Sequence, residues 1–196
     1  MDIRTYLNFL EVAEKLKCNT RHSYTSSGRP ESVAEHSWRL ALMAYLVKDE
    51  FPEVNIDRVI QMCLFHDMGE AVTGDIPCFE KTDGDEAVEE DAVAGLVRLL
   101  PQPYRQETAQ LFAEMGELRT AEARLYKALD KLEALIQHNE ADLSTWIPLE
   151  YDLQMTYGTK ECDFAEYLKR LRDVVREDSR EKIAASGQQP SAGGRG

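Results

Sequence analysis

His66 and Asp67 stand side by side at the end of an apolar run. An imidazole nitrogen and a carboxylate oxygen together suit a first-row divalent metal ion, but two protein ligands do not hold such an ion tightly. Neighbouring side chains on a helix point about 100° apart, so this pair can converge on one ion only where the backbone turns. We expect Gly69 and Gly74 to give the backbone that freedom. Further ligands must come from other parts of the chain.

Two more ligand-type residues lie on or beside apolar helix faces. His36 falls in the first turn of a predicted helix, because Ser32 and Glu35 match the capping box that begins helices. Asp130 interrupts the leucine stripe of a later helix, where a lone carboxylate is costly unless a cation meets it. Each residue alone is more often structural, but together they form a two-imidazole, two-carboxylate set that leaves room for water on a six-coordinate ion. The candidate ligands are His36, His66, Asp67 and Asp130.

The elements that must position these side chains are helices, because apolar residues recur mainly at spacings of three and four. We found no convincing strand pattern and no internal repeat, and the segment 21–30 has the composition of a loop. The tail 183–196 lacks periodicity, so we expect it to be disordered. We expect most of the circumference of the helix that follows Ser32 to be buried. We also expect Trp38, in that helix, and Trp146, near the other end of the chain, to lie in the core. The predicted helices span 2–17, 32–50, 56–67, 85–100, 104–115, 120–139, 143–155 (one or two short helices) and 164–182.

Composition narrows the classes of function. A chain of 196 residues fits one domain with its own core, here placed at 1–182. The formal net charge of −13 opposes binding to polymeric nucleic acid, which requires a basic surface. A small phosphorylated ligand needs only a few local cations, so that class of substrate stays open.

The four cysteines are scattered singly, without a CxxC pair, and are interpreted as reduced thiols. No apolar run approaches the length that crosses a bilayer, and no secretory signal pattern is present. These features predict a cytoplasmic protein without a membrane partner.

The ordered set of ligand-type residues resembles the HD superfamily of metal-dependent phosphohydrolases, whose pattern is a His, then a His-Asp pair, then a distant Asp on a later helix. The resemblance covers roughly residues 1–180 and is strongest to the branch of bacterial and eukaryotic 5′-deoxynucleotidases. The segments that carry it are 31–37 around His36, 66–70 with the His-Asp pair, and 73–77 around Asp75. It implies an all-α helical bundle, and homodimers are common in this family.

The resemblance also implies residues that bind substrate. Arg21 matches an arginine that contacts the substrate phosphate in that branch, whereas His22 replaces a tryptophan that lies beside the sugar. A smaller polar ring there weakens the exclusion of a ribose 2′-hydroxyl, unless Tyr24 takes over part of that role. Arg29 in the same loop and Lys81 are further cations for neutralising phosphate.

The chemistry that fits is hydrolysis of a phosphomonoester with one divalent ion, for which Mn, Co, Fe, Ni, Zn and Mg all suit the ligand set. Glu70 and Asp75 lie just outside that set, where one can deprotonate water and the other protonate the departing oxygen. We therefore predict a 5′-nucleotidase acting on nucleoside or deoxynucleoside monophosphates. The alternatives are an HD phosphodiesterase or pyrophosphohydrolase on another nucleotide, and a non-catalytic metal-dependent regulatory module.

Overall fold

In the computed structural model, residues 1–77 and 79–186 are described, and they divide into two compact units. The first unit contains Met1–His22 and Pro30–Asp130, and the second contains Ser23–Arg29 and the chain from Lys131 onward. Cys78 and most of the tail predicted to be disordered lie outside the described residues.

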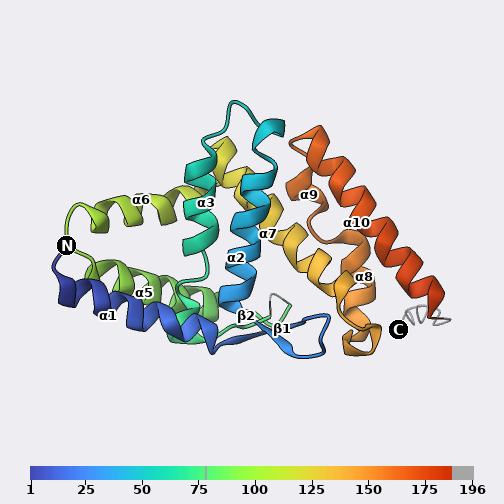
Figure 1. Ribbon diagram of the computed structural model, residues 1–196, viewed down its shortest axis with the longest axis horizontal. Coiled ribbons are helices and arrows are strands. Elements are labelled where there is room, and N and C mark those ends of the chain that lie inside the picture. Colours follow the sequence, from blue (N-terminus) through green and yellow to red (C-terminus); the bar gives the residue numbers. More distant parts are fainter. Residues whose placement is uncertain (78, 187–196) are drawn as a thin grey trace. The chain divides into compact units, whose positions relative to one another are not determined.

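The first unit is helical apart from one short hairpin (Figure 1). The helix α7 passes from the first unit into the second, and three further α-helices follow it. The elements in chain order are α1 (Ile3–Glu14), η1 (Lys15–Lys17), β1 (Thr20–Tyr24), β2 (Pro30–Ser32), α2 (Val33–Leu46), η2 (Lys48–Glu50), α3 (Ile56–Phe65), α4 (Glu70–Thr73), α5 (Asp83–Leu99), α6 (Tyr104–Glu117), α7 (Ala121–Glu140), η3 (Leu143–Thr145), α8 (Pro148–Thr156), α9 (Thr159–Cys162) and α10 (Glu166–Ala185). The all-α prediction is confirmed, and α10 extends three residues past the expected domain end at 182.

The predicted capping box at the start of α2 is present. The Glu35 amide donates to Ser32 Oγ at 3.3 Å, and the Ser32 amide donates to Glu35 Oε2 at 2.9 Å. These bonds satisfy backbone donors that a helix start leaves without partners. They fix the first turn of α2, and with it the direction of His36.

The core of the first unit joins elements that flank the candidate ligands. Leu16, Val33 and Met68 are buried in one apolar cluster, together with Ala71 of α4 and Leu96 of α5. Phe9 of α1, Phe65 of α3 and Phe112 of α6 are among the partly buried residues packed against it. Burial of these side chains holds the turn after α3 in a fixed place.

The expectation of a loop over 21–30 was wrong at both ends of that segment. β1 and β2 pair in a two-stranded sheet, and the Thr25 amide donates to the Arg29 carbonyl at 2.8 Å across the turn. Gly28 adopts a φ of 82° in this turn, a conformation that costs glycine little. Strands this short carry no long alternation of apolar and polar residues, so their pattern could not be distinguished from that of a loop.

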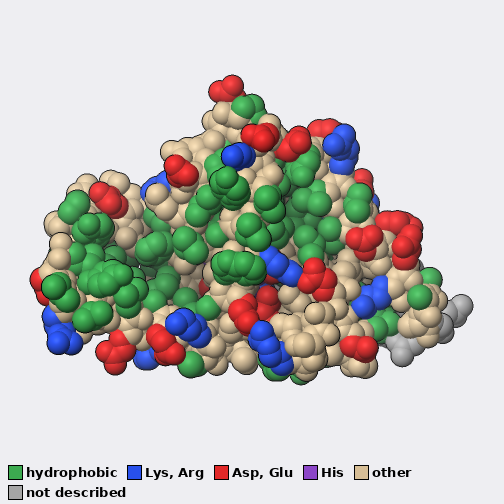
Figure 2. All heavy atoms as spheres, viewed as in Figure 1, with side chains coloured by type: hydrophobic (Ala, Val, Ile, Leu, Met, Phe, Trp, Pro, Cys, Tyr) green, Lys and Arg blue, Asp and Glu red, His purple; other side chains and the backbone are tan. Residues whose placement is uncertain are grey.

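The expectation that most of α2 is buried was also wrong. Trp38 is 63% exposed, Leu42 41%, Tyr45 52% and Leu46 69%, and these side chains lie three or four residues apart on one face. Figure 2 shows apolar side chains gathered over α2. In contrast, Trp146 is buried as expected, and its Nε1 donates to the His138 carbonyl at 3.1 Å.

Two buried polar side chains in the second unit, Arg172 and Glu150, have partners within that unit. The fully buried side chain of Arg172 donates to the carbonyls of Gln154 and Tyr157 at 2.7 and 2.8 Å. His138 Nε2 contacts Glu150 Oε1 at 2.5 Å. These contacts join α7, α8 and α10.

None of the helices in residues 1–77 and 79–186 combines the length and apolar character that crossing a membrane requires. The three described cysteines, Cys18, Cys63 and Cys162, are thiols outside any disulfide, as the sequence predicted.

Candidate metal centre

The backbone turns at the His66-Asp67 pair. α3 ends at Phe65, the amide of His66 still donates to the Met62 carbonyl at 2.9 Å, and a turn over 66–69 leads into α4. This break in the helix lets adjacent side chains face one point, as the sequence analysis required.

The two glycines after this turn act differently from one another. Gly74 has a φ of 79° and ends α4, a conformation that side chains rarely adopt. Gly69 has ordinary helical angles, so it does not supply conformational freedom as expected. A Cβ on Gly69 would lie 2.8 Å from Glu89 Cγ and 3.1 Å from Val93 Cγ2. Gly69 therefore allows α5 to approach the turn closely.

The structure brings the four predicted ligands together. His36 Nε2 lies 3.3 Å from His66 Nε2 and 3.2 Å from Asp130 Oδ1. Asp67 Oδ2 lies 3.0 Å from His66 Nε2 and 3.9 Å from His36 Nε2, and Asp130 Oδ1 lies 3.7 Å from His66 Nε2. The donors come from α2, the turn after α3, and α7.

The protonation of His66 is set by its other nitrogen. His66 Nδ1 lies 2.9 Å from the Cys63 carbonyl, which can only accept a hydrogen bond, so Nδ1 carries the proton. Nε2 is then the ring nitrogen that faces Asp67 and His36. Second partners of this kind usually orient metal-ligating histidines.

Both carboxylates of the set are ionised. Burial alone would raise the pKa of Asp67, but the charge and hydrogen bond of His66 and the charge of His36 lower it to about 2. Burial opposes ionisation of Asp130 as well, yet Lys127 and the two histidines hold its pKa well below the usual range. Anionic carboxylate oxygens and imidazole nitrogens therefore face each other.

These spacings fit one divalent ion. Ligands about 2.1 Å from an ion and at right angles to one another stand about 3 Å apart, which matches the shorter contacts of the set. Among the described residues, His36, His66 and Asp67 form one of the groups able to hold an ion, and Asp130 extends that group.

Glu70 and Asp75 lie beside the donor set, and the surroundings of each raise its pKa. Burial and the charges of Asp67 and Asp75 raise the pKa of Glu70 to about 10. Glu70 Oε2 is buried and has no hydrogen-bond partner within the described part of the chain. Burial also raises the pKa of Asp75, an effect that Arg21 opposes and Asp67 strengthens. An unpaired buried carboxyl oxygen is costly, which suggests that a water, an ion or substrate meets it.

Asn19 was not predicted as part of this site. Its Nδ2 donates to the Glu70 carbonyl at 2.5 Å, and its carbonyl accepts from the Val33 amide at 3.0 Å. Asn19 thus ties the start of α4 to the start of α2. A single asparagine after a helix gives no pattern from which this role could be predicted.

The substrate-binding candidates occupy different places. Arg21 forms an ion pair with Glu31 at 3.2 Å, and its charge acts on both Glu70 and Asp75. The His22 ring meets the ring of Phe79 edge-on, with centroids 5.6 Å apart, so His22 borders the segment after α4. Arg29 is exposed in the second unit, and its assignment to substrate stays a prediction.

Two lysines supply local positive charge in the first unit. Lys81 forms an ion pair with Glu89 of α5. Lys127 Nζ lies 2.9 Å from Asp130 Oδ2, on the opposite oxygen from the one that faces the histidines. Sequence reasoning missed Lys127, although its spacing of three residues before Asp130 on one helix was a usable signal.

Comparisons with known proteins identify the family of this chain. The family model described as HD domain matches residues 13–172. Human 5′-deoxynucleotidase HDDC2 is 36% identical over 141 residues, which are 70% of this chain and 68% of the human protein. 5′-Deoxynucleotidase hdd1 of Schizosaccharomyces pombe is 29% identical, with 92% of this chain and 93% of the yeast protein covered.

A solved structure extends the likeness to the whole fold. A protein of Magnetospirillum magnetotacticum, described as a predicted metal-dependent phosphohydrolase, has a TM-score of 0.77 and 31% sequence identity. The match covers 96% of this chain and 98% of that protein. The chain belongs to the HD domain family, and the fold and enzyme class expected from its sequence are confirmed.

Proposed function

We propose that this protein is a 5′-nucleotidase that releases phosphate from nucleoside and 2′-deoxynucleoside 5′-monophosphates with one divalent metal ion. The observation that carries the proposal is the convergence of four metal-type donors beside two further carboxyl groups. The names of the human and yeast relatives, both 5′-deoxynucleotidases, support the substrate class.

His36, His66, Asp67 and Asp130 would hold the ion. When bound, such an ion lowers the pKa of water toward neutrality and offsets charge on a phosphoryl oxygen. Glu70 and Asp75 lie on the flank of this set, where one accepts the proton of the attacking water. The other carboxyl gives a proton to the 5′-oxygen as the P–O bond breaks. The products are inorganic phosphate and a nucleoside.

Cationic side chains would attract the negatively charged phosphate to the site, although the chain as a whole is acidic. Arg21 already acts electrostatically on Glu70 and Asp75, which places its charge at the reacting end of the site. Lys127, paired with Asp130, adds a second charge near the donors. Such groups stabilise charge that develops on the transferred phosphoryl oxygens.

Product analysis tests this function. Metal-stripped protein is reloaded with Mn, Co, Fe, Ni, Zn or Mg and incubated with ribo- and deoxyribonucleoside 5′-monophosphates. Release of inorganic phosphate and nucleoside in equal amounts is expected. In parallel incubations, release of pyrophosphate from nucleoside triphosphates, or of a monophosphate from a phosphodiester, would instead support the phosphodiesterase or pyrophosphohydrolase alternative. Metal binding without any hydrolysis would support a regulatory module.

We also infer that residues 1–182 act as one HD domain in the cytoplasm and as a homodimer. The match over 13–172 runs through both compact units, which supports one domain. The described cysteines are reduced thiols, as expected in the cytoplasm. The exposed apolar face of α2 supports self-association, because apolar patches commonly mark interfaces.

A further inference from the structure

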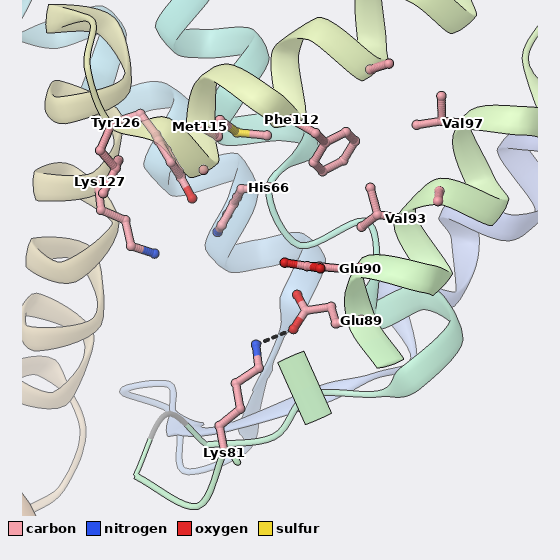
Figure 3. A pocket seen from close by; sticks show the side chains of 14 residues that line it. His66, Lys81, Glu89, Glu90, Val93, Val97, Phe112, Met115, Tyr126 and Lys127 are labelled. Carbon is pink, nitrogen blue, oxygen red and sulfur yellow. Dashed lines mark hydrogen bonds and ion pairs between the residues drawn. The ribbon is translucent and has the colours of Figure 1, made fainter. Parts of the chain in front are cut away.

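A cavity of about 640 Å³ opens beside His66 in the first unit (Figure 3). Its walls come from α5, α6 and the start of α7, and His66 itself forms part of the wall. Pockets that bind small molecules commonly have volumes of about 300–1,000 Å³. The cavity is therefore continuous with the metal centre and large enough for a ligand.

The wall of this cavity is mainly apolar and aromatic away from the metal donors. Val93 and Val97 line it from α5, and Phe112 and Met115 line it from α6. Tyr126 completes the wall, and its ring lies edge-on to His66 with centroids 5.5 Å apart. Figure 3 shows Phe112 and Val97 at one end of the cavity and Lys81 at the other.

The cavity is lined by two lysines and two glutamates, Lys81, Lys127, Glu89 and Glu90. Lys127 lines it while contacting Asp130, and Lys81 lines it while paired with Glu89. With the phosphate at the metal centre, next to His66 and Lys127, the remainder of a bound molecule would extend along the apolar wall. A flat aromatic group suits that wall, because faces and edges of aromatic rings pack well against one another.

We propose that this cavity binds the base of the nucleotide, while the phosphate lies at the metal centre. The inference rests on the proposed nucleotidase function and adds a base subsite to it. Phe112 and Tyr126 provide the aromatic surface, and the valines of α5 provide the apolar floor. Nucleotides should then react better than sugar phosphates that lack a base.

Gly116 on α6 gives a way to fill the cavity without disturbing the fold. It lines the cavity, and a Cβ added there would have no heavy atom within 4 Å. Gly95 on α5 is a matched control, because its added Cβ would meet only Arg98 Nη2, at 3.9 Å, and Gly95 does not line the cavity. Both glycines are helical, so Leu increases helix propensity equally at each.

The test compares 2′-deoxyadenosine 5′-monophosphate with 2-deoxyribose 5-phosphate, which has no base. Gly116→Leu should lower the ratio of kcat/KM values, nucleotide over sugar phosphate, by about tenfold or more, the scale of a lost stacking contact. Gly95→Leu should leave that ratio unchanged. An unchanged ratio in Gly116→Leu, or an equal fall in both variants, would overturn the base subsite.

A second pair of variants removes the aromatic surface and keeps most of the bulk. Phe112→Leu should lower the same ratio, whereas Phe9→Leu should not. Both phenylalanines pack against the same apolar cluster, but only Phe112 lines the cavity. We expect the two variants to have similar thermal stability. Their ratios of kcat/KM values, nucleotide over sugar phosphate, should nevertheless differ. Identical ratios for the two variants would contradict the proposal.

Direct binding separates this proposal from the proposed function. The probe is 2′-deoxyadenosine, which has no phosphate, and its affinity for the metal-loaded protein is measured by calorimetry or NMR. Binding that is weakened in Gly116→Leu supports the subsite even if no nucleotide is hydrolysed. Hydrolysis of nucleotides with nucleoside binding unaffected by Gly116→Leu would keep the function and overturn the subsite.

Discussion

Lys127 and Asp130 form an ion pair across one turn of α7, with Nζ 2.9 Å from Oδ2. Asp130 Oδ1 meanwhile lies 3.2 Å from His36 Nε2. One carboxylate thus contacts a candidate metal ligand with one oxygen and a cation with the other. The arrangement places a positive charge beside the candidate metal ligands, where we propose that the substrate phosphate binds.

Replacement of Lys127 by Met should therefore impair catalysis more than metal binding. We expect kcat/KM for a nucleoside monophosphate to fall by about 10²-fold, as on removal of one group that stabilises transition-state charge. Metal content, measured by mass spectrometry, should stay at one ion per chain. Lys131→Met is the control, because it makes the same change on the same helix in a residue paired with Glu161. If kcat/KM fell equally in the two variants, the loss would come from the change in overall charge and not from the position of Lys127.

The convergence of the four candidate ligands could be predicted from sequence, whereas the cavity could not. A His-Asp pair at the end of an apolar run and an aspartate within a leucine stripe each stand out by residue type. The cavity depends on how closely α5 approaches the turn at Gly69 and on the bare side of Gly116, which are facts of packing. Sequence periodicity reports which face of a helix is apolar and does not report what covers it.

The same limit explains the error at Trp38. The apolar residues of α2 surround most of the helix, which predicts burial, yet one face is exposed in the protomer. If a second copy of the chain covers that face, the apolar residues around α2 are buried in the dimer, as their pattern predicts.

That explanation predicts a change of oligomeric state. Trp38→Arg should convert a dimer into a monomer, because it places a charge at the exposed apolar face of α2. Light scattering after gel filtration measures the mass directly. Val174→Arg is the control, since Val174 is 59% exposed on α10. A wild-type protein that is monomeric at all concentrations would contradict the homodimer.

Glu70 provides a test of acid–base chemistry. Glu70→Gln should retain the metal and substrate binding but lower kcat by about 10²–10⁴-fold, the usual contribution of a general acid or base. Glu114→Gln makes the same change in a carboxylate that pairs with Arg58 at 2.8 Å, and should be nearly neutral for kcat. Loss of the ion from Glu70→Gln would make Glu70 a ligand rather than a proton carrier.

His22 should set the preference for the sugar. The resemblance to the deoxynucleotidase branch implies that His22 takes the place of a tryptophan beside the sugar, which leaves more room beside C2′, so ribonucleotides should be accepted. Because excluded volume alone discriminates by about 10–200-fold, kcat/KM for a ribonucleotide should come within about 200-fold of its deoxy analogue. His22→Trp should shift the preference toward the deoxy substrate at constant metal content. Strict rejection of ribonucleotides by the wild type would indicate that another residue, such as Tyr24, excludes the 2′-hydroxyl.

The most direct measurement follows metal content and phosphate release together in wild type, His66→Ala and Asp67→Ala. His66 Nε2 and Asp67 Oδ2 lie 3.0 Å apart and face His36, so either substitution removes a donor from the centre. We predict that wild type binds one divalent ion and releases phosphate from 2′-deoxynucleoside 5′-monophosphates, and that each variant loses the ion and the activity together. Stoichiometric metal with normal turnover in Asp67→Ala would contradict the assignment of this centre.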